Sequence, residues 1–267
     1  RLNYTASSNN IVRNYLDENN LPIDGLDIWD DYWNVGESNQ HNQQLVLNYD
    51  LPINKIPVLS FVKSTYTYTG DYNWQRSSDA FSSVTGEDGN IYALGNSIQN
   101  ANSHKLNTTL NMDLFYKYIG LTKTKSNKKK PVSEKDKKVA PKPGEQVKAP
   151  KGNVTLERSA FMSGLIGVIT SVKNIQINYT ENNGTVLPGY LPGLGFFGSS
   201  KPTLGFVFGS QSDVRYEAAK NGWLTNYPEF NQNFTQVENK KISFTAQMEL
   251  FPDLKIDFTA DRTYAYN

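Results

Sequence analysis

The sequence predicts an all-β protein of about seven antiparallel strands. The main observation is a one-by-one alternation of apolar and polar residues, clearest from Lys105 to Leu114. Successive side chains of a strand point to opposite faces, so Leu106 and Leu110 share one face while Lys105 and Asn107 share the other. One face of the predicted sheet therefore meets an apolar medium, which is either a protein core or a lipid bilayer.

Six further segments alternate in the same way. They are Leu2–Ala6, Leu45–Leu51, Val62–Trp74, Ile175–Tyr179, Ile242–Leu250 and Leu254–Tyr264. The apolar fraction of the chain is 37%, which is low for a soluble domain. A barrel with a water-filled lumen would have such a composition, because lipid covers one face and water the other. The alternation alone fits a soluble β-sandwich equally well.

The connections between the segments favour a membrane barrel. In an antiparallel sheet that follows the sequence order, the short connections Pro52–Pro57 and Phe251–Asp253 fall at one end together with a lysine-rich segment. The long connections, residues 7–41, 75–95 and 181–233, fall at the other end. Short periplasmic turns and long outer loops are typical of outer-membrane barrels, whereas a sandwich has no reason to sort its loops. Tyr72 and Trp74 then lie where aromatic rings meet lipid headgroups.

This interpretation assigns a medium to each strand face. The residues expected to face lipid are Tyr66, Tyr68, Leu106, Leu110, Met112, Ile175, Ile177, Phe244, Met248, Ile256 and Phe258. The residues expected to face the lumen are Lys105, Asn107, Asn111, Asp113, Gln247, Glu249 and Asp257.

The chain divides into four parts. Residues 1–122 are expected to hold barrel strands 1–4 with their outer loops, and residues 170–267 strands 5–7 with a Gly/Pro-rich outer loop. Between them, residues 123–153 are rich in lysine and proline and lack aromatic residues, which predicts a disordered periplasmic loop. This loop has no interleaved aromatics or arginine, so we expect no nucleic-acid binding. Residues 154–169 are expected to form a short periplasmic helix. Both ends of the chain adjoin strand patterns, so we expect a fragment of a longer chain.

The predicted outer loop after residue 186 is apolar and rich in glycine. Its candidate cap or partner residues are Leu187, Pro188, Gly189, Tyr190, Leu191, Pro192, Phe196 and Phe197. An exposed apolar loop of this length either binds a partner or folds back into the lumen or its cap, and the sequence leaves both open.

No motif for catalysis or metal binding is present. His41 and His104 are the only histidines and have no catalytic companions in a recognisable motif. The acidic stretch Asp27–Asp31 lacks the spacing of an EF-hand. There is no cysteine, and no run of about 18 apolar residues that would form a transmembrane helix. We therefore expect no enzymatic activity, no cofactor and no metal.

Several short motifs occur in the order found in one protein family. They are Thr170–Asn174, Asn178–Thr185, Leu187–Tyr190, Leu51–Pro52 with Lys55–Pro57, Tyr72–Trp74, Gly95–Asn100, Gly205–Gly209, Gly222–Leu224 and Asp253–Asp257. Together they resemble the SprA (Sov) family of Bacteroidota, although this chain is far shorter than the family's members.

The resemblance implies part of a very large antiparallel transmembrane β-barrel in the bacterial outer membrane. It further implies the translocon of the type IX secretion system, which exports folded cargo proteins and supports gliding motility. The expected partners are outer-membrane lipid, a PorV-like barrel, a periplasmic plug protein and the secreted cargo.

Two alternatives stay open at this point. One is a porin-like or TonB-dependent-receptor-like uptake barrel, and the other is a soluble surface β-adhesin. The length of the parent gene separates the first from a translocon, because uptake barrels need far fewer strands. Release from cells without detergent would identify an adhesin.

Overall fold

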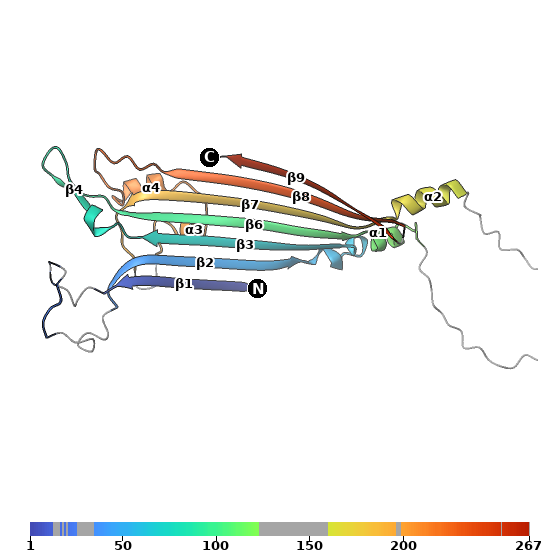
Figure 1. Ribbon diagram of the computed structural model, residues 1–267, viewed down its shortest axis with the longest axis horizontal. Helices are drawn as coiled ribbons and strands as arrows, with labels where there is room; N and C mark the ends of the chain where they lie inside the picture. The colour runs from blue at the N-terminus through green and yellow to red at the C-terminus, as the bar shows by residue number, and fades with distance from the viewer. Residues whose placement is uncertain are drawn as a thin grey trace, which may run out of the picture.

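A computed structural model describes residues 1–12, 17, 19, 21–25, 35–122, 160–195, 199–251 and 253–266. In this part of the chain the main feature is a seven-stranded sheet in the order β1-β2-β3-β6-β7-β8-β9, in which all neighbours are antiparallel (Figure 1). The strands are β1 Leu2–Ile11, β2 Glu37–Leu51, β3 Val62–Gln75, β6 Asn96–Asn111, β7 Val172–Tyr190, β8 Thr235–Phe251 and β9 Leu254–Tyr266. The prediction of a seven-stranded antiparallel sheet is confirmed.

The connections are sorted between the two ends of the sheet. The end that we call the loop end holds the connections from β1 to β2, from β3 to β6 and from β7 to β8, with described residues 76–95, 191–195 and 199–234. The opposite end, the turn end, holds the other three connections, with described residues 52–61, 112–122, 160–171 and 253. Residues 76–95 contain the short helix η3 (Asp79–Phe81) and a separate small hairpin of β4 (Ser83–Thr85) and β5 (Ile91–Ala93). The sequence analysis did not predict this hairpin.

Strand β6 ends earlier than the alternation predicts. Its last residue is Asn111, and Met112–Tyr118 form helix α1. The Asn111 side chain accepts a hydrogen bond from the Leu114 backbone amide at 3.2 Å and so caps the helix. The predictions that Met112 faces lipid and Asp113 faces the lumen as parts of a strand are therefore wrong.

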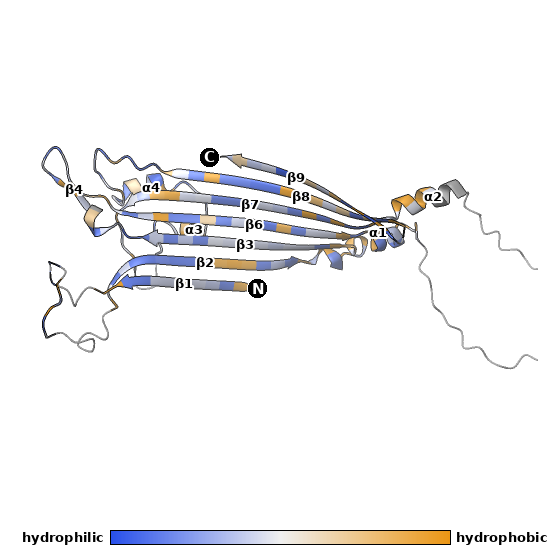
Figure 2. Cartoon of the chain, in the orientation of Figure 1, coloured by the Kyte–Doolittle hydropathy of each residue, from blue (hydrophilic) through white to orange (hydrophobic). Residues whose placement is uncertain are grey.

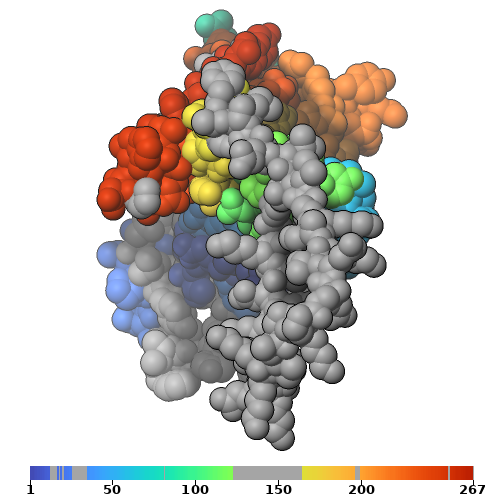
Figure 3. Space-filling model, turned by 90° about the vertical axis from the view of Figure 1, so that its right-hand side faces the viewer, coloured from blue at the N-terminus to red at the C-terminus, as the bar shows by residue number. Residues whose placement is uncertain are grey.

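Short helices lie at the turn end of the sheet. After β2 come η1 (Pro52–Lys55) and η2 (Pro57–Leu59), and before β7 comes α2 (Ala160–Ile169). The Tyr116 hydroxyl donates to the Ile169 carbonyl at 2.6 Å and joins α1 to α2. Figure 3 looks at this end, with α1 in green and α2 in yellow near its middle. The rest of the predicted helix, residues 154–159, and the lysine-rich residues 123–153 lie outside the described residues.

Residues 191–195 and 199–234, which we call the covering segment, fold back over one face of the sheet near the loop end. They contain α3 (Leu204–Val207) and α4 (Arg215–Lys220), and Figure 1 shows both helices lying against the strands. The hydrophobic core lies beneath this segment. Its buried members are Tyr72, Trp74, Ile98, Leu187, Tyr190, Phe206, Val207, Val214 and Ala218.

The core changes the interpretation of two aromatic residues. Tyr72 and Trp74 are only 1% and 3% exposed, because the covering segment packs on them. The Tyr72 ring makes an edge contact with Phe206 at 6.2 Å between centroids. The prediction that these two rings meet lipid headgroups is therefore wrong, because they pack against the chain's own covering segment.

Candidate functional site

The strand register places the apolar sides of all seven alternating segments on one face of the sheet. Residues directly opposite each other in an antiparallel pair share a face. Tyr66 of β3 is opposite Tyr49 of β2 and Leu106 of β6, and Leu106 is opposite Tyr179 of β7. The other pairs continue this arrangement to both edges. We call this side of the sheet the apolar face and its reverse the polar face.

The apolar face carries every predicted lipid-facing residue that lies in a strand. These are Tyr66, Tyr68, Leu106, Leu110, Ile175, Ile177, Phe244, Met248, Ile256 and Phe258. Tyr68 contacts the covering segment through its hydroxyl, whereas Phe258 is 53% exposed and Phe244 37%. Figure 2 shows β2 changing from blue at the loop end to orange farther along the strand. The exposed apolar residues thus form a band toward the turn end, and their contact with lipid stays a prediction.

The polar face carries the predicted lumen residues. Lys105, Asn107, Gln247, Glu249 and Asp257 lie on it. One row of paired residues joins three of the predicted positions, with Asn111 as the further one, across the sheet. It runs Asn111–Asn174–Gln247–Asp257. Asn111 belongs to this row and also caps α1, so its side chain is tied to the backbone of the helix.

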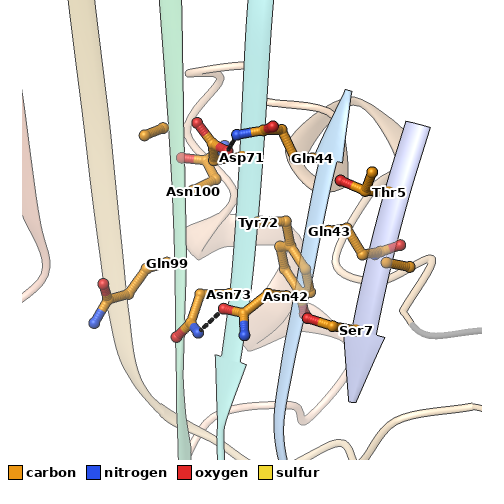
Figure 4. Close-up of a pocket in the computed structure, with 12 residues that line it drawn as sticks. Thr5, Ser7, Asn42, Gln43, Gln44, Asp71, Tyr72, Asn73, Gln99 and Asn100 are labelled. Atoms are coloured by element: carbon orange, nitrogen blue, oxygen red, sulfur yellow. Dashed lines mark hydrogen bonds between the residues drawn. The ribbon is translucent and has the colours of Figure 1, made fainter. Parts of the chain in front are cut away.

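A polar hollow lies on the same face near the loop end. Residues of β1, β2, β3 and β6 line a cavity of about 380 Å³, and Figure 4 labels Asn42, Gln44, Asp71 and Asn73 among those on the polar face. Two hydrogen bonds join neighbouring strands there, from Gln44 to Asp71 at 2.8 Å and from Asn73 to Asn42 at 2.6 Å. Most groups lining the hollow are neutral amides and hydroxyls, with Asp71 as the charged member. This surface offers hydrogen bonds to water or to another molecule and carries little charge.

The apolar band ends at a border of tyrosines and paired charges. The Tyr66 hydroxyl and His104 Nδ1 are 2.7 Å apart, and the Tyr179 hydroxyl donates to Glu181 at 2.7 Å. The Lys240 ammonium lies 4.0 Å from the Glu181 carboxylate. Tyrosines with an apolar body and a polar tip are typical of the boundary between an apolar medium and water.

Beyond this border, side chains of the apolar face hold the covering segment by its backbone. Asn100, which is 4% exposed, donates to the carbonyls of Phe206 at 3.0 Å and Ser210 at 2.7 Å. Asn102 donates to the Gly209 carbonyl at 2.7 Å, and Gln211 donates to the Asn100 side chain at 3.1 Å. The Phe206 carbonyl also accepts from the Gly209 amide and the Gly209 carbonyl from Gln211, both at 3.1 Å, so the Ser210 carbonyl depends most on its bond from Asn100.

A glycine of β3 allows this close contact. A Cβ atom on Gly70 would lie 2.2 Å from the Phe208 carbonyl oxygen. Gly209, at φ +95°, approaches the same strand and lies near the Gly70 Cα atom. The sheet and the covering segment therefore touch through their backbones at this point.

The structure separates the candidate cap or partner residues into two groups. Leu187, Pro188, Gly189 and Tyr190 are the last residues of β7, and Leu187 and Tyr190 belong to the buried core. Leu191 and Pro192 begin the covering segment, and the Pro192 carbonyl accepts from the Trp74 indole at 3.2 Å. The described part of the segment folds onto the apolar face and not onto the polar face that was expected to line the lumen. Phe196 and Phe197 lie outside the described residues.

The residues that hold the covering segment are not marked by the alternation in the sequence. Asn100 and Asn102 lie in a polar part of β6 where no apolar alternation marks a face. One signal was available, since Gly70 interrupts the apolar side of an otherwise regular strand, and glycine inside a strand often marks a close approach of another backbone.

Electrostatic contacts also order the outer side of the covering segment. Arg215 donates to both carboxylate oxygens of Asp213, and it lies 4.4 Å from the centre of the Phe234 ring. The Arg215 guanidinium holds the pKa of the Asp213 carboxyl below its usual range, and the Arg215 backbone amide adds to this effect.

The described residues offer no metal site. No group of three or more histidine, cysteine, aspartate or glutamate side chains is arranged there to bind a metal ion. Within the same residues no helix is long and apolar enough to cross a membrane. The acidic stretch Asp27–Asp31 falls outside them.

Comparison with protein-family models and with curated protein sequences finds no match for this chain.

Proposed function

We propose that this chain is part of the wall of a protein-conducting barrel in the bacterial outer membrane. The observation that carries the proposal is the division of one antiparallel sheet into an exposed apolar band and a polar reverse face. Lipid would contact the band, and the polar face would line a wet lumen. The wall would act by its geometry, with no catalytic group required.

The dimensions of the band fit a bilayer. At about 3.4 Å per residue, the stretch from Ile242 to Leu250 is roughly 27 Å long. A strand tilt of about 40° leaves roughly 20 Å of this along the membrane normal, close to the apolar band of about 25 Å in outer-membrane barrels. The tyrosine border at Tyr66 and Tyr179 then lies at the outer headgroups. Phe251, which is 66% exposed, lies beside the turn at the periplasmic end.

The resemblance to the SprA (Sov) family supports a more specific proposal. The barrel would be the type IX secretion translocon, which exports folded cargo and supports gliding motility. A PorV-like barrel and a periplasmic plug protein would be its partners. The neutral amides around the polar hollow suit this function, because a lumen that passes many cargoes must not bind any of them tightly.

One complementation experiment tests both levels of the proposal. A strain depleted of the full-length protein receives the wild type, Phe244→Arg or Gln247→Arg. Both positions are exposed on β8 but lie on opposite faces. Arginine on the lipid face near the midplane costs about 2–4 kcal/mol, so only Phe244→Arg should reduce the amount of folded barrel in the outer membrane.

The readouts are heat-modifiable barrel in purified outer membranes and cargo proteins in the medium. Equal assembly of the two variants would contradict the lipid-facing assignment. Normal cargo secretion in the depleted strain would rule out the translocon function. It would not contradict the proposal that the chain forms part of a barrel wall.

A further inference from the structure

The edge of the covering segment runs along the border of the apolar band. Residues 208–211 cross three neighbouring strands beside the row of residues that contains Tyr68, His104 and Glu181. Three contacts fix this course. They are Tyr68 hydroxyl to Phe208 carbonyl at 2.6 Å, Asn102 amide to Gly209 carbonyl at 2.7 Å, and Thr185 hydroxyl to Gln211 side chain at 2.7 Å. The segment therefore stops where the band begins.

This edge presents apolar side chains outward. Leu204 and Phe208 are 63% and 36% exposed, whereas Phe206 between them is fully buried. Residues four apart on a helical turn lie on one side of it, so Leu204 and Phe208 are neighbours. The Phe208 ring also makes an edge contact with Tyr4 at 6.3 Å between centroids. The pair thus continues the aromatic border on the side of β1.

We propose that Leu204 and Phe208 contact lipid in the headgroup region of the outer leaflet. The inference rests on the proposed membrane barrel, in which the covering segment lies outside the wall and directly above the bilayer. Lipid is the occupant that the observations favour, because the exposed edge is continuous with the band that lipid would cover. The segment would then rest on the membrane surface and limit how deeply the wall sinks into it.

Spin labels at single cysteines test this contact. This stretch of the protein contains no cysteine, so L204C gives one label here once any cysteine elsewhere in the full-length protein is replaced. Tyr216→Cys is the matched control, because Tyr216 is 77% exposed in the same segment and α4 lies closer to the loop end than α3 (Figure 1). Phe244→Cys and Gln247→Cys report on the two faces of the wall.

The labelled full-length protein is placed in bilayers that contain phosphatidylethanolamine and lipopolysaccharide, and collisions with oxygen and with a water-soluble nickel chelate are measured. We expect the oxygen-to-nickel ratio at residue 204 to exceed that at residue 216 and to lie below that at residue 244. Equal ratios at residues 204 and 216, with a high ratio at residue 244, would overturn this inference alone. A low ratio at residue 244 would instead overturn the proposed membrane wall.

A photo-crosslinking residue at position 204 separates lipid from a protein partner. Crosslinks to lipopolysaccharide or phospholipid in cells support the proposal. A crosslink to one defined protein at that position would show that a protein contacts this edge in place of lipid, and would overturn the proposal.

Discussion

Gly70 is the residue at which the sheet and the covering segment come closest. Its missing side chain leaves room for the Phe208 carbonyl, which also accepts a hydrogen bond from Tyr68. Packed protein has little freedom to shift a backbone carbonyl, since interiors are as dense as organic crystals. One hydrogen atom in place of a methyl group therefore determines how closely the covering segment can approach β3.

We predict that Gly70→Ala loosens the covering segment without unfolding the sheet. The added Cβ would lie 2.2 Å from the Phe208 oxygen, and relieving such an overlap costs about 1–3 kcal/mol. Hydrogen exchange of residues 204–211 should become faster. Gly184→Ala is the control, because the nearest atom there is a Val237 methyl at 3.3 Å that can move. Unchanged hydrogen exchange in Gly70→Ala would show that the Phe208 carbonyl does not pack closely against residue 70.

The Asp213–Arg215 pair predicts a pH dependence at the start of α4. The folded-state pKa of Asp213 is lowered, so its contribution to local stability is present above the ordinary carboxyl pKa of about 3.9. That contribution is lost as the pH falls through the lowered folded pKa. Exchange of the α4 amides, corrected for intrinsic rates, should differ between wild type and Asp213→Asn at pH 7. The difference should shrink as the pH falls below about 3.9 toward the lowered folded pKa, and a constant difference would contradict the assignment.

At the scale of the element, the alternation predicts nearly all of β3 and β9 but only part of the other strands. The turn-end part of β2, Leu45–Leu51, alternates and was predicted, whereas residues 37–44 are polar on both faces and were not. Alternation needs one apolar face, and it is lost in β2 and β6 where that face carries buried polar side chains such as Gln43, Asn100 and Asn102.

The position of the covering segment was harder to predict for another reason. The apolar composition of the covering segment indicates that it packs against another surface. Either face of the sheet or a separate protein could supply that surface. The choice of face depends on Asn100 and Asn102 pairing with backbone carbonyls far along the chain. Such polar contacts between distant segments leave no periodic signal in the sequence.

We predict that Asn100→Leu releases the covering segment from β6. The change removes the donor to the Ser210 carbonyl and one of two donors to the Phe206 carbonyl, which keeps its bond from the Gly209 amide. A buried carbonyl left unpaired costs about 1–3 kcal/mol. Added protease should cut residues 199–211 faster on intact cells. Asn107→Leu is the control, because Asn107 is exposed on the polar face of the same strand. Equal cleavage of the two variants would argue against a role for Asn100 in holding the segment.

At the scale of the whole molecule, the described sheet is open. Strands β1 and β9 each pair with one neighbour, so alternate backbone groups along both edges point away from the sheet. Unpaired backbone groups cannot lie in the hydrocarbon region of a bilayer, where each costs several kcal/mol. If the apolar band is in lipid, further strands must therefore pair with both edges.

This requirement gives the last prediction. In the full-length protein held in a bilayer, the outward-pointing amides of β9, Leu254–Tyr266, should be as strongly protected from hydrogen exchange as those of β7, which lies between two strands in the sheet. Exchange read by mass spectrometry at single-residue resolution measures this, with the amide of the exposed Ser200 in the covering segment as the reference. In a soluble β-adhesin that ends its sheet at β9, alternate amides of that strand would exchange at rates close to the reference. Protection along the whole of β9 therefore distinguishes a continuous wall from an isolated sheet, because only a neighbouring strand can supply acceptors along its full length.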